Sequence, residues 1–417
     1  FLLLHNVLYY GNSPFVLRFL SGLFVTGSAA LVSFILLREG FKKSAAILAG
    51  ACFLFQPTVV ETGVFVRMYG LFLFEATLLL FILQSLFQKP GDRRLIAGGG
   101  IVLALALYTS YFALLLTASL GLAGLLLLPK KQTQAFGLAI ISICLCAGLL
   151  AIPWMLVLPR FVHQESGAVN AANRLNEVFT LLSILGGSGI ATLVLLAGLA
   201  TAIWNPDSRK AAIFLSCFWV AIPVAILSIA SPTNRPVVER YVCYTWPALF
   251  IAGVLGIRVI LSKYKTALGI FLGILLIWNF GMTNLRVFVR YPDWWEAASI
   301  IEHNAKPRET IMTGGFLSGE GMVYHLKNPR DFTFLHYVTT LDGFYVAARD
   351  PEVVWYVNSA PLPKSYSDIM RRYFPYRVSF IGNGTMNLIT VASKKNFTMS
   401  DGSPATYFEP VPLEYEK

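Results

Sequence analysis

The sequence predicts a polytopic α-helical membrane bundle followed by a small α/β domain outside the membrane. Its 417 residues are 56% hydrophobic and only 13% charged, whereas soluble domains are about half apolar and a quarter charged. Apolar runs long enough to cross a bilayer recur along residues 15–284. Beyond these runs, apolar residues are scattered, and prolines and charges become more frequent. We therefore expect two domains, 1–285 in the membrane and 286–417 in water.

Hydropathy predicts about ten membrane spans. Their expected bounds are 15–37, 44–60, 68–87, 95–108, 111–128, 135–158, 178–203, 211–231, 241–261 and 266–284. The stretch 95–128 is either one very long helix or two short ones joined at Tyr108–Tyr111. Two spans place all five strongly basic loops on one side, whereas a single helix would put KPGDRR opposite PKKQ. The charge pattern therefore favours two.

The basic loops also orient the protein. By the positive-inside rule, the side that carries them is the cytoplasm, so we expect a multi-pass protein of the cell membrane with residues 286–417 outside the cytoplasm. Residues 1–285 hold 19 Lys and Arg against 8 Asp and Glu, whereas the tail holds 14 of each. The net charge of +11 is thus a topology signal, and it does not indicate nucleic-acid binding, which needs a basic patch on a soluble surface.

The basic residues of the predicted outer side are all arginines. They are Arg18, Arg67, Arg160, Arg174, Arg235 and Arg240. One interpretation is that their side chains extend to lipid headgroups. The other is recognition of an anion, because the planar guanidinium fits phosphate oxygens and stays charged at any working pH. The absence of lysine from this set favours phosphate recognition by at least two of them.

Four stretches resemble the GT-C glycosyltransferases, in particular the branch of protein O-mannosyltransferases and aminoarabinose transferases. They begin FLLLHNVLYYGNSPFVLRF at Phe1, RMYGLFLF at Arg67, ALYTSYFALLL at Ala106 and RYVCYTWPALFIAG at Arg240. PDWWEAASIIEHN, which opens the tail, resembles the start of the extracytoplasmic domain in bacterial members. The succession and spacing run through most of residues 1–262, although no single motif is decisive.

The resemblance implies transfer of a sugar from a polyprenyl-phosphate carrier to an acceptor at the outer face of the membrane, with inversion. The acceptor is a protein, a lipid or a cell-surface glycan. An acidic base would deprotonate the acceptor hydroxyl, and arginines would stabilise the lipid-phosphate leaving group. Such enzymes need no nucleotide and no tightly bound cofactor, and the sequence leaves a role for a divalent metal open.

Two departures concern the catalytic residues. The principal aspartate of the family lies in a first outer loop that precedes the FLLLH stretch, so we expect the first span and this loop to be missing here. Many relatives also carry a glutamate two residues before the arginine of RMY, where this chain has Phe65. Glu61 is the nearest acid, and it lies under two turns from Arg67 if the segment is helical. Glu61 and His5, in LLLH, are the catalytic candidates. The alternative for Glu61 is a surface acid, and the alternative for His5 is a structural residue.

The candidates for substrate binding lie on the same predicted side. They are Arg67, Tyr69, Tyr108, Tyr111, Arg235, Arg240 and Tyr241. The tyrosines of the YTSY turn line the sugar site or belong to an aromatic belt. Glu75 lies inside a predicted span, where an acid is costly and is by default a functional hypothesis; a hydrogen bond to a neighbouring helix explains it as well. The loop 159–177, with His163 and Glu165, covers the acceptor or is a solvated linker.

Other signals are weaker. The cysteines, none of them in the tail, lie in or beside spans and suggest neither a disulfide framework nor a metal site. In the tail we expect helices at DWWEAASIIEHN and SYSDIMRRYF and strands at ETIMTGG, PEVVWYVN, YRVSFIG and MNLITVAS. A transporter of a lipid-linked or anionic substrate is the alternative function, although no internal repeat supports it. The third candidate function is that of a non-catalytic membrane scaffold.

Overall fold

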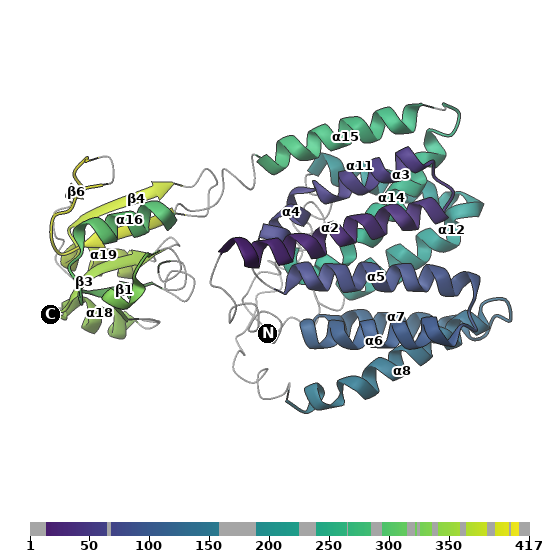
Figure 1. Ribbon diagram of the computed structural model, residues 1–417, viewed down its shortest axis with the longest axis horizontal. Helices are drawn as coiled ribbons and strands as arrows, with labels where there is room; N and C mark the ends of the chain where they lie inside the picture. Colours follow the sequence, from purple (N-terminus) through teal and green to yellow (C-terminus); the bar gives the residue numbers. More distant parts are fainter. Residues whose placement is uncertain are drawn as a thin grey trace. The chain divides into compact units, whose positions relative to one another are not determined.

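The computed structural model consists of two compact units, Phe1–Asn284 and Leu285–Lys417, which we call the membrane unit and the tail unit (Figure 1). It describes residues 14–64, 68–157, 189–224, 239–264, 266–284, 294–314, 322, 326–335, 341–358, 364–381, 388–399 and 402–407.

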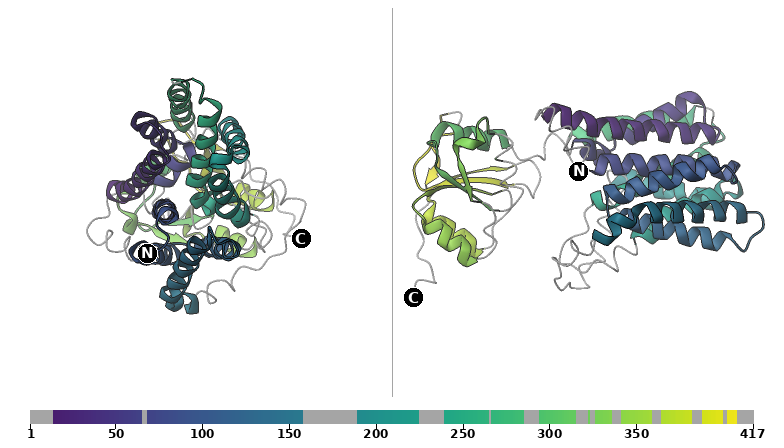
Figure 2. Two further views of the ribbon diagram at one scale, coloured as in Figure 1. Left: turned by 90° about the vertical axis from the view of Figure 1, so that its right-hand side faces the viewer. Right: turned by 60° about the horizontal axis from the view of Figure 1, so that its bottom comes forward.

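The membrane unit is a bundle of helices that lie side by side, seen end on in Figure 2. The elements are α2 (Pro14–Arg38), α3 (Lys43–Leu54), α4 (Pro57–Val64), α5 (Tyr69–Gln88), α6 (Arg93–Thr109), α7 (Ala113–Leu127), α8 (Gln134–Val157), α11 (Gly189–Trp204), α12 (Pro206–Ile213), the π-helix η1 (Phe214–Ala221), the 3-10 helix η2 (Glu239–Thr245), α14 (Trp246–Ile260) and α15 (Ala267–Thr283). Large apolar side chains such as Leu149, Leu156 and Ile277 lie exposed on the outside of the bundle, as expected for a lipid-facing surface.

Fewer helices qualify as membrane spans than the sequence predicts. Within the described residues, four are long and apolar enough to cross a membrane, or five if the bent pair α3–α4 forms one span. The four are Phe19–Arg38, Tyr69–Gln88, Gln134–Leu156 and Val242–Ile260. Shorter apolar helices, among them α7 and α15, complete the bundle. The structure therefore supports a multi-span helical protein, and the number of ten stays a prediction.

The predicted span 44–60 is a broken helix rather than a continuous one. Lys43–Leu54 and Pro57–Gly63 form an angle of 67°. The break has a local cause, since Pro57 lacks an N–H and disfavours helical geometry at Gln56 before it. Helix α4 ends at Val64 and α5 begins at Tyr69, and the expected helical link from Glu61 to Arg67 runs through residues 65–67, which lie outside the described residues.

The stretch 95–128 forms two helices, as the loop charges predict. The C-cap of α6 is Ser110, and Ala113 begins α7. Gly99 and Gly124 both pack on Ile143 or its neighbours in α8, while Tyr108 bonds to Leu150 further along that helix. In α7, Gly124 packs on Ile141, while the earlier Thr117 has its carbonyl oxygen 3.7 Å from the thiol of the later Cys144. Residue numbers along α8 therefore rise with those of α6 and fall with those of α7, which makes α6 and α7 antiparallel.

The basic loops gather at one end of the bundle, which we call the Arg38 end. The turns that join α2 to α3, α5 to α6, α7 to α8 and α14 to α15 lie on the right of the membrane unit in Figure 1. Arg258 of α14 donates to the Glu39 carbonyl oxygen (2.7 Å), and Gln84 of α5 donates to that of Ile35 (3.1 Å). We call the opposite end, where α5 begins, the Tyr69 end.

Helices α11 and α14 approach each other through glycines. A Cβ added at Gly256 would lie 1.6 Å from the carbonyl oxygen of Gly198, and one added at Gly198 would lie 2.2 Å from that of Gly253. Small residues let helix backbones pack closely. This close packing stabilises the association of helices in lipid, where burial of apolar surface between helices gives no driving force.

The tail unit contains a six-stranded mixed sheet in the order β2-β1-β3-β5-β4-β6. The strands are β1 (Thr310–Thr313), β2 (Thr333–Leu335), β3 (Val353–Asn358), β4 (Tyr376–Ile381), β5 (Leu388–Ser393) and β6 (Thr406–Tyr407). Strand β1 pairs in parallel with β2 and β3, whereas β3, β5, β4 and β6 pair antiparallel. The sheet confirms the small α/β fold expected for the tail.

Helices cover both faces of this sheet, as Figure 2 shows for the tail unit. On one face, Trp355 and Val357 pack with Ile300 of α16 (Trp294–Asn304). On the other, Tyr356 packs with Phe344 of α18 (Leu341–Arg349) and Met370 of α19 (Lys364–Tyr373). The alternation of side chains along β3 thus builds two apolar cores. The two predicted helices and four predicted strands are present, whereas α18, β2 and β6 were not predicted.

Candidate functional site

Three elements that carry predicted site residues meet at the Tyr69 end. Helix α4 contains Glu61, α5 begins with Tyr69, and η2 contains Arg240 and Tyr241. Helix α4 contacts both α5 and η2, and α5 contacts η2. Segments far apart in the sequence therefore converge on one end of the bundle.

Helix α2 anchors α4 and α5 at this end. Ser21 of α2 donates its hydroxyl to the carbonyl oxygen of Thr62 in α4 (3.3 Å). A Cβ added at Gly70 of α5 would lie 2.7 Å from the Ser21 hydroxyl oxygen, so only glycine allows this approach of α5. The hydroxyl of Thr62 bonds within α4, to the carbonyl oxygen of Thr58 (2.8 Å). The Ser21 hydroxyl thus links α2 to α4 and also lies against the start of α5.

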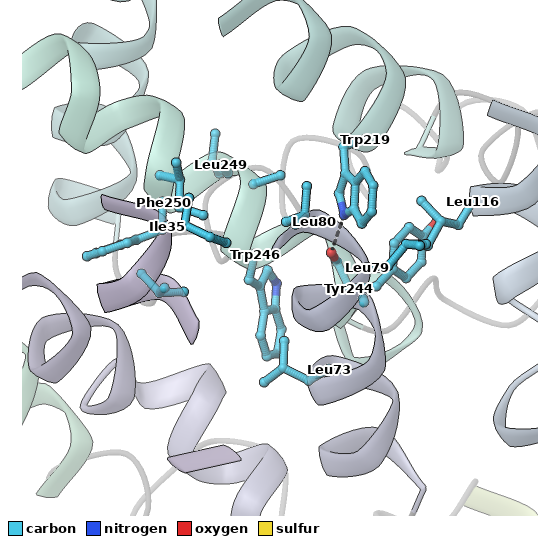
Figure 3. Packing of buried hydrophobic residues seen from close by; sticks show 14 of the residues in the cluster. Ile35, Leu73, Leu79, Leu80, Leu116, Trp219, Tyr244, Trp246, Leu249 and Phe250 are labelled. Atoms are coloured by element: carbon cyan, nitrogen blue, oxygen red, sulfur yellow. Dashed lines mark hydrogen bonds between the residues drawn. The ribbon is translucent and has the colours of Figure 1, made fainter. Parts of the chain in front are cut away.

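The segment η2 is fixed on its other sides by aromatic residues. The Trp219 indole N–H donates to the Tyr244 carbonyl oxygen (2.7 Å), as Figure 3 shows. The ring of Tyr244 packs on that of Phe72 with centroids 5.2 Å apart, and the thiol of Cys243 points to the Tyr69 carbonyl oxygen (3.9 Å). These residues are buried. The backbone that leads from Arg240 into α14 is therefore held firmly against the start of α5.

Glu61 is half-buried on α4, and one of its carboxylate oxygens is inaccessible to solvent. Tyr69 is almost completely buried, which favours a role in packing the start of α5 over direct exposure to a ligand. Helix α4, which contains Glu61, contacts α5, which begins with Tyr69.

Glu75 lies one to two turns further along α5 and is buried. One of its carboxyl oxygens accepts a hydrogen bond from the Thr109 hydroxyl at the end of α6 (3.0 Å). The contact is the hydrogen bond between helices that the sequence left as an alternative to a functional role. It ties the α6–α7 turn to α5 near the Tyr69 end.

The two tyrosines of the predicted sugar site both lie at the α6–α7 turn and are about half exposed. The Tyr108 hydroxyl donates to the carbonyl oxygen of Leu150 in α8 (3.1 Å). The ring of Tyr111 stacks against Phe112, with centroids 4.2 Å apart. Their exposure agrees with a place in an aromatic belt, and Tyr108 also links α6 to α8.

Several predicted residues cannot be placed. His5, Arg67, Arg160, His163, Glu165, Arg174 and Arg235 lie outside the described residues. Arg18, Arg240 and Tyr241 have a described backbone only. In the described part of the chain, no group of three or more His, Cys, Asp or Glu is arranged to hold a metal ion.

Sequence reasoning missed the residues that fix these elements to one another. Ser21, Thr109, Asn279 and Thr283 each donate to another helix. Asn279 offered a usable signal, because an amide within the apolar run of α15 needs a partner in lipid. The hydroxyl residues offered none, since Ser and Thr commonly bond to their own helix.

Comparison with known proteins gives two sequence matches. Residues 4–165 match the dolichyl-phosphate-mannose-protein mannosyltransferase family. The undecaprenyl phosphate-alpha-4-amino-4-deoxy-L-arabinose arabinosyl transferase of Enterobacter sp. (strain 638) is 27% identical over 242 residues, which are 53% of this chain and 42% of that protein. The chain therefore aligns with less than half the length of this curated relative.

Two solved structures share the fold over most of the chain. The crystal structure of ArnT from Cupriavidus metallidurans in the apo state matches with a TM-score of 0.52 and 14% identity, covering 90% of this chain and 83% of that one. The structure of the same protein bound to undecaprenyl phosphate matches with a TM-score of 0.52 and 16% identity, covering 90% and 84%. The predicted resemblance to protein O-mannosyltransferases and aminoarabinose transferases is confirmed by the two sequence matches, and the solved structures show the shared fold.

Proposed function

We propose that this protein is a membrane glycosyltransferase that transfers a sugar from a polyprenyl-phosphate carrier to an acceptor at the outer face of the cell membrane. The observation that carries the proposal is the shared fold with ArnT, which has been solved with undecaprenyl phosphate bound. The matched family and the curated relative support it, because both names describe transfer of a sugar from a polyprenyl phosphate.

The proposed reaction is a displacement at the anomeric carbon. The acceptor hydroxyl attacks this carbon and loses its proton to a carboxylate, while the bond between the carbon and the phosphate oxygen breaks. The polyprenyl phosphate leaves with the electron pair, and the configuration of the sugar inverts. Glu61 is our candidate for the proton acceptor within the described residues, because α4 contacts the elements that carry Tyr69 and Arg240. His5 is the second candidate.

Arginines are proposed to stabilise the charge of the leaving phosphate. Arg240 and Tyr241 belong to η2, which contacts both α4 and α5, and Arg67 precedes α5 by two residues. Together with Arg235, the guanidinium groups of Arg67 and Arg240 supply planar, permanently charged donors to phosphate oxygens, and Tyr241 is proposed to bind beside them. Tyr108 and Tyr111 are proposed to border the same site, and the buried Tyr69 is proposed to hold the start of α5 beside it.

We further propose that the Tyr69 end faces the outside of the cell, that about ten spans cross the membrane, and that the tail unit is extracytoplasmic. Support comes from the basic loops at the Arg38 end, which the positive-inside rule assigns to the cytoplasm. A single cysteine introduced by Lys131→Cys should resist an impermeant thiol reagent added to intact cells. Labelling from outside would contradict this orientation.

The function is tested with the purified protein in liposomes that contain an undecaprenyl-phosphate-linked radiolabelled sugar and a set of candidate acceptors. Loss of a charge-assisted bond in Arg240→Ala should lower transfer about tenfold to hundredfold. Arg174→Ala is the matched control, because Arg174 lies in the polar stretch NAANRLNE and its loss should cost under about 1 kcal/mol. Movement of the intact lipid-linked sugar between leaflets, without cleavage, would contradict the proposal and favour the transporter.

A further inference from the structure

The break between α3 and α4 leaves backbone carbonyl groups of α3 without their helical partners. In a continuous helix the Gln56 N–H would bond to the carbonyl oxygen of Cys52, but here it bonds to that of Phe53 (3.1 Å). The Val59 N–H, which would bond to Phe55, bonds to Gln56 (3.0 Å) instead. The carbonyl oxygens of Cys52 and Phe55 are thus released by the break at Pro57, and in an apolar surrounding each needs another donor.

Helix α15 supplies both donors. The side-chain amide of Asn279 donates to the Cys52 carbonyl oxygen (2.9 Å), and the Thr283 hydroxyl donates to that of Phe55 (2.8 Å). Positions 279 and 283 are four residues apart and therefore lie on one face of α15. Both side chains are buried, and the ring of Phe280 packs edge-on against Phe55 at 5.6 Å between centroids. Both carbonyl oxygens that the break releases, those of Cys52 and Phe55, therefore have a donor on α15.

We call the bent junction between α3 and α4 the α3–α4 elbow. It is not the arrangement that stability alone would select. Three residues each have one buried side-chain oxygen that makes no hydrogen bond among the described residues: Gln56, Thr58 and Asn279. Such atoms carry a desolvation cost that an apolar or unbroken helix would avoid. Departures of this kind are expected where a function needs the geometry, and the element that the elbow redirects is α4, which contains Glu61.

We infer that Asn279 and Thr283 are positioning residues, which hold the α3–α4 elbow so that α4 presents Glu61 at the Tyr69 end. The inference rests on the proposed function, and it adds a role for the last membrane helix. Helix α15 contacts α3 and α4 and ends at Thr283, directly before the boundary with the tail unit. The residue that caps the elbow is therefore part of the segment through which the chain enters the tail.

The test uses near-isosteric substitutions in the full chain. Thr283→Val and Asn279→Leu remove the donors with little change in volume, and Thr283→Ser keeps the hydroxyl. Thr201→Val is the matched control, since among the described residues the Thr201 hydroxyl donates within its own helix, to the Ala197 carbonyl oxygen (3.0 Å). Hydrogen exchange of the amides in 58–64 reports the elbow independently of any activity. Each single variant should exchange there about threefold to tenfold faster, and the double variant about tenfold to hundredfold.

The second readout is sugar transfer, compared by a double-mutant cycle. If the elbow acts through Glu61, then kcat should fall in Thr283→Val, recover in Thr283→Ser, and fall little further when Thr283→Val is added to Glu61→Gln. Unchanged exchange in 58–64 would overturn the elbow contact. Faster exchange with unchanged kcat, or with losses that simply add to that of Glu61→Gln, would overturn the positioning role. A parent protein that transfers no sugar would overturn the proposed function, while the exchange data would still decide the contact.

Discussion

Different interactions stabilise the interior of the membrane unit and the interior of the tail unit. In the tail unit, alternation along the strands builds two apolar cores, and Lys395 forms an ion pair with Glu309 (2.7 Å). In the membrane unit, polar side chains such as Asn279 and Ser21 donate to backbone carbonyls of other helices, and α11 meets α14 through glycines.

The difference follows from the solvent. In water, burial of apolar surface stabilises a fold by roughly 25 cal/mol per Å², so the tail unit tolerates imperfect contacts. Lipid is as apolar as a leucine side chain, so helices there associate through close fit and through hydrogen bonds. Small changes of shape should therefore be costly in the membrane unit, whereas changes of charge should matter in the tail unit.

The largest effect is expected where two helix backbones touch. In Gly256→Ala the new Cβ would meet the Gly198 carbonyl oxygen at 1.6 Å, so α11 and α14 must separate, at a cost of about 3 kcal/mol. Gly269→Ala in α15 is the control, because nothing lies within 4 Å of its Cβ position, and it should be neutral or stabilising by up to about 1 kcal/mol. Thermal unfolding in detergent measures both. Equal melting temperatures would contradict the role of close fit.

A smaller effect is expected from a carboxylate in the tail unit. Glu309 accepts hydrogen bonds from the Trp355 indole (2.7 Å) and the Lys395 ammonium group (2.7 Å), and Trp355 is completely buried. Glu309→Ala should therefore destabilise the tail unit by about 1–3 kcal/mol. Hydrogen exchange of β1 and β3 in the whole protein measures the loss. The exposed Glu352 provides the control, and a Glu352→Ala variant with the same loss would show that the contacts of Glu309 are not the cause.

The same carboxylate predicts a pH dependence. Partial burial would raise the pKa of Glu309, but hydrogen bonds from Lys395 and Trp355 outweigh it and hold the pKa below its usual value of 4.5. Since the folded protein has the lower pKa, this stabilisation is fully present above about pH 4.5 and is lost as the pH falls through the folded value. Protection of β3 should thus fall towards that of Glu309→Gln only in acid. A difference between parent and variant that stayed constant down to pH 3 would contradict this.

The smallest effect is expected from a single hydroxyl in the membrane unit. Thr109→Val removes the hydrogen bond to Glu75 (3.0 Å) while keeping the shape, and such interhelical bonds average about 0.6 kcal/mol in membrane proteins. The melting temperature should fall slightly, and less than in Gly256→Ala. Thr117→Val, which removes a bond within α7, is the comparison. A loss larger than that of Gly256→Ala would reverse the ranking of close fit over polar contacts.

Much of the fold follows from sequence patterns. The basic loops predicted the reversal between α6 and α7, and periodicity in the tail predicted α16, α19 and four strands. The break at Pro57 was missed because hydropathy treats proline within an apolar run as part of the span. Strands β2 and β6 have three and two residues, so their pairing partners define them more than their own sequence does.

The sequence alone names the charged and tyrosine residues of the candidate site, and their roles stay predictions. Glu61 and Arg240 stand out because acids and arginines are rare among apolar residues. Thr283 and Phe55, in contrast, bond across 228 positions of sequence, and no local pattern indicates a hydroxyl that serves a distant carbonyl. Contacts between a side chain and a distant backbone carbonyl become visible only in three dimensions.

The most direct test of the central claim is a cryo-electron microscopy structure of the protein with undecaprenyl phosphate. We predict the phosphate at the Tyr69 end, between α4, α5 and η2, with the Arg240 guanidinium within hydrogen-bond distance of its oxygens. Phosphate density at the Arg38 end, or saturation with the lipid phosphate without any density near η2, would contradict it.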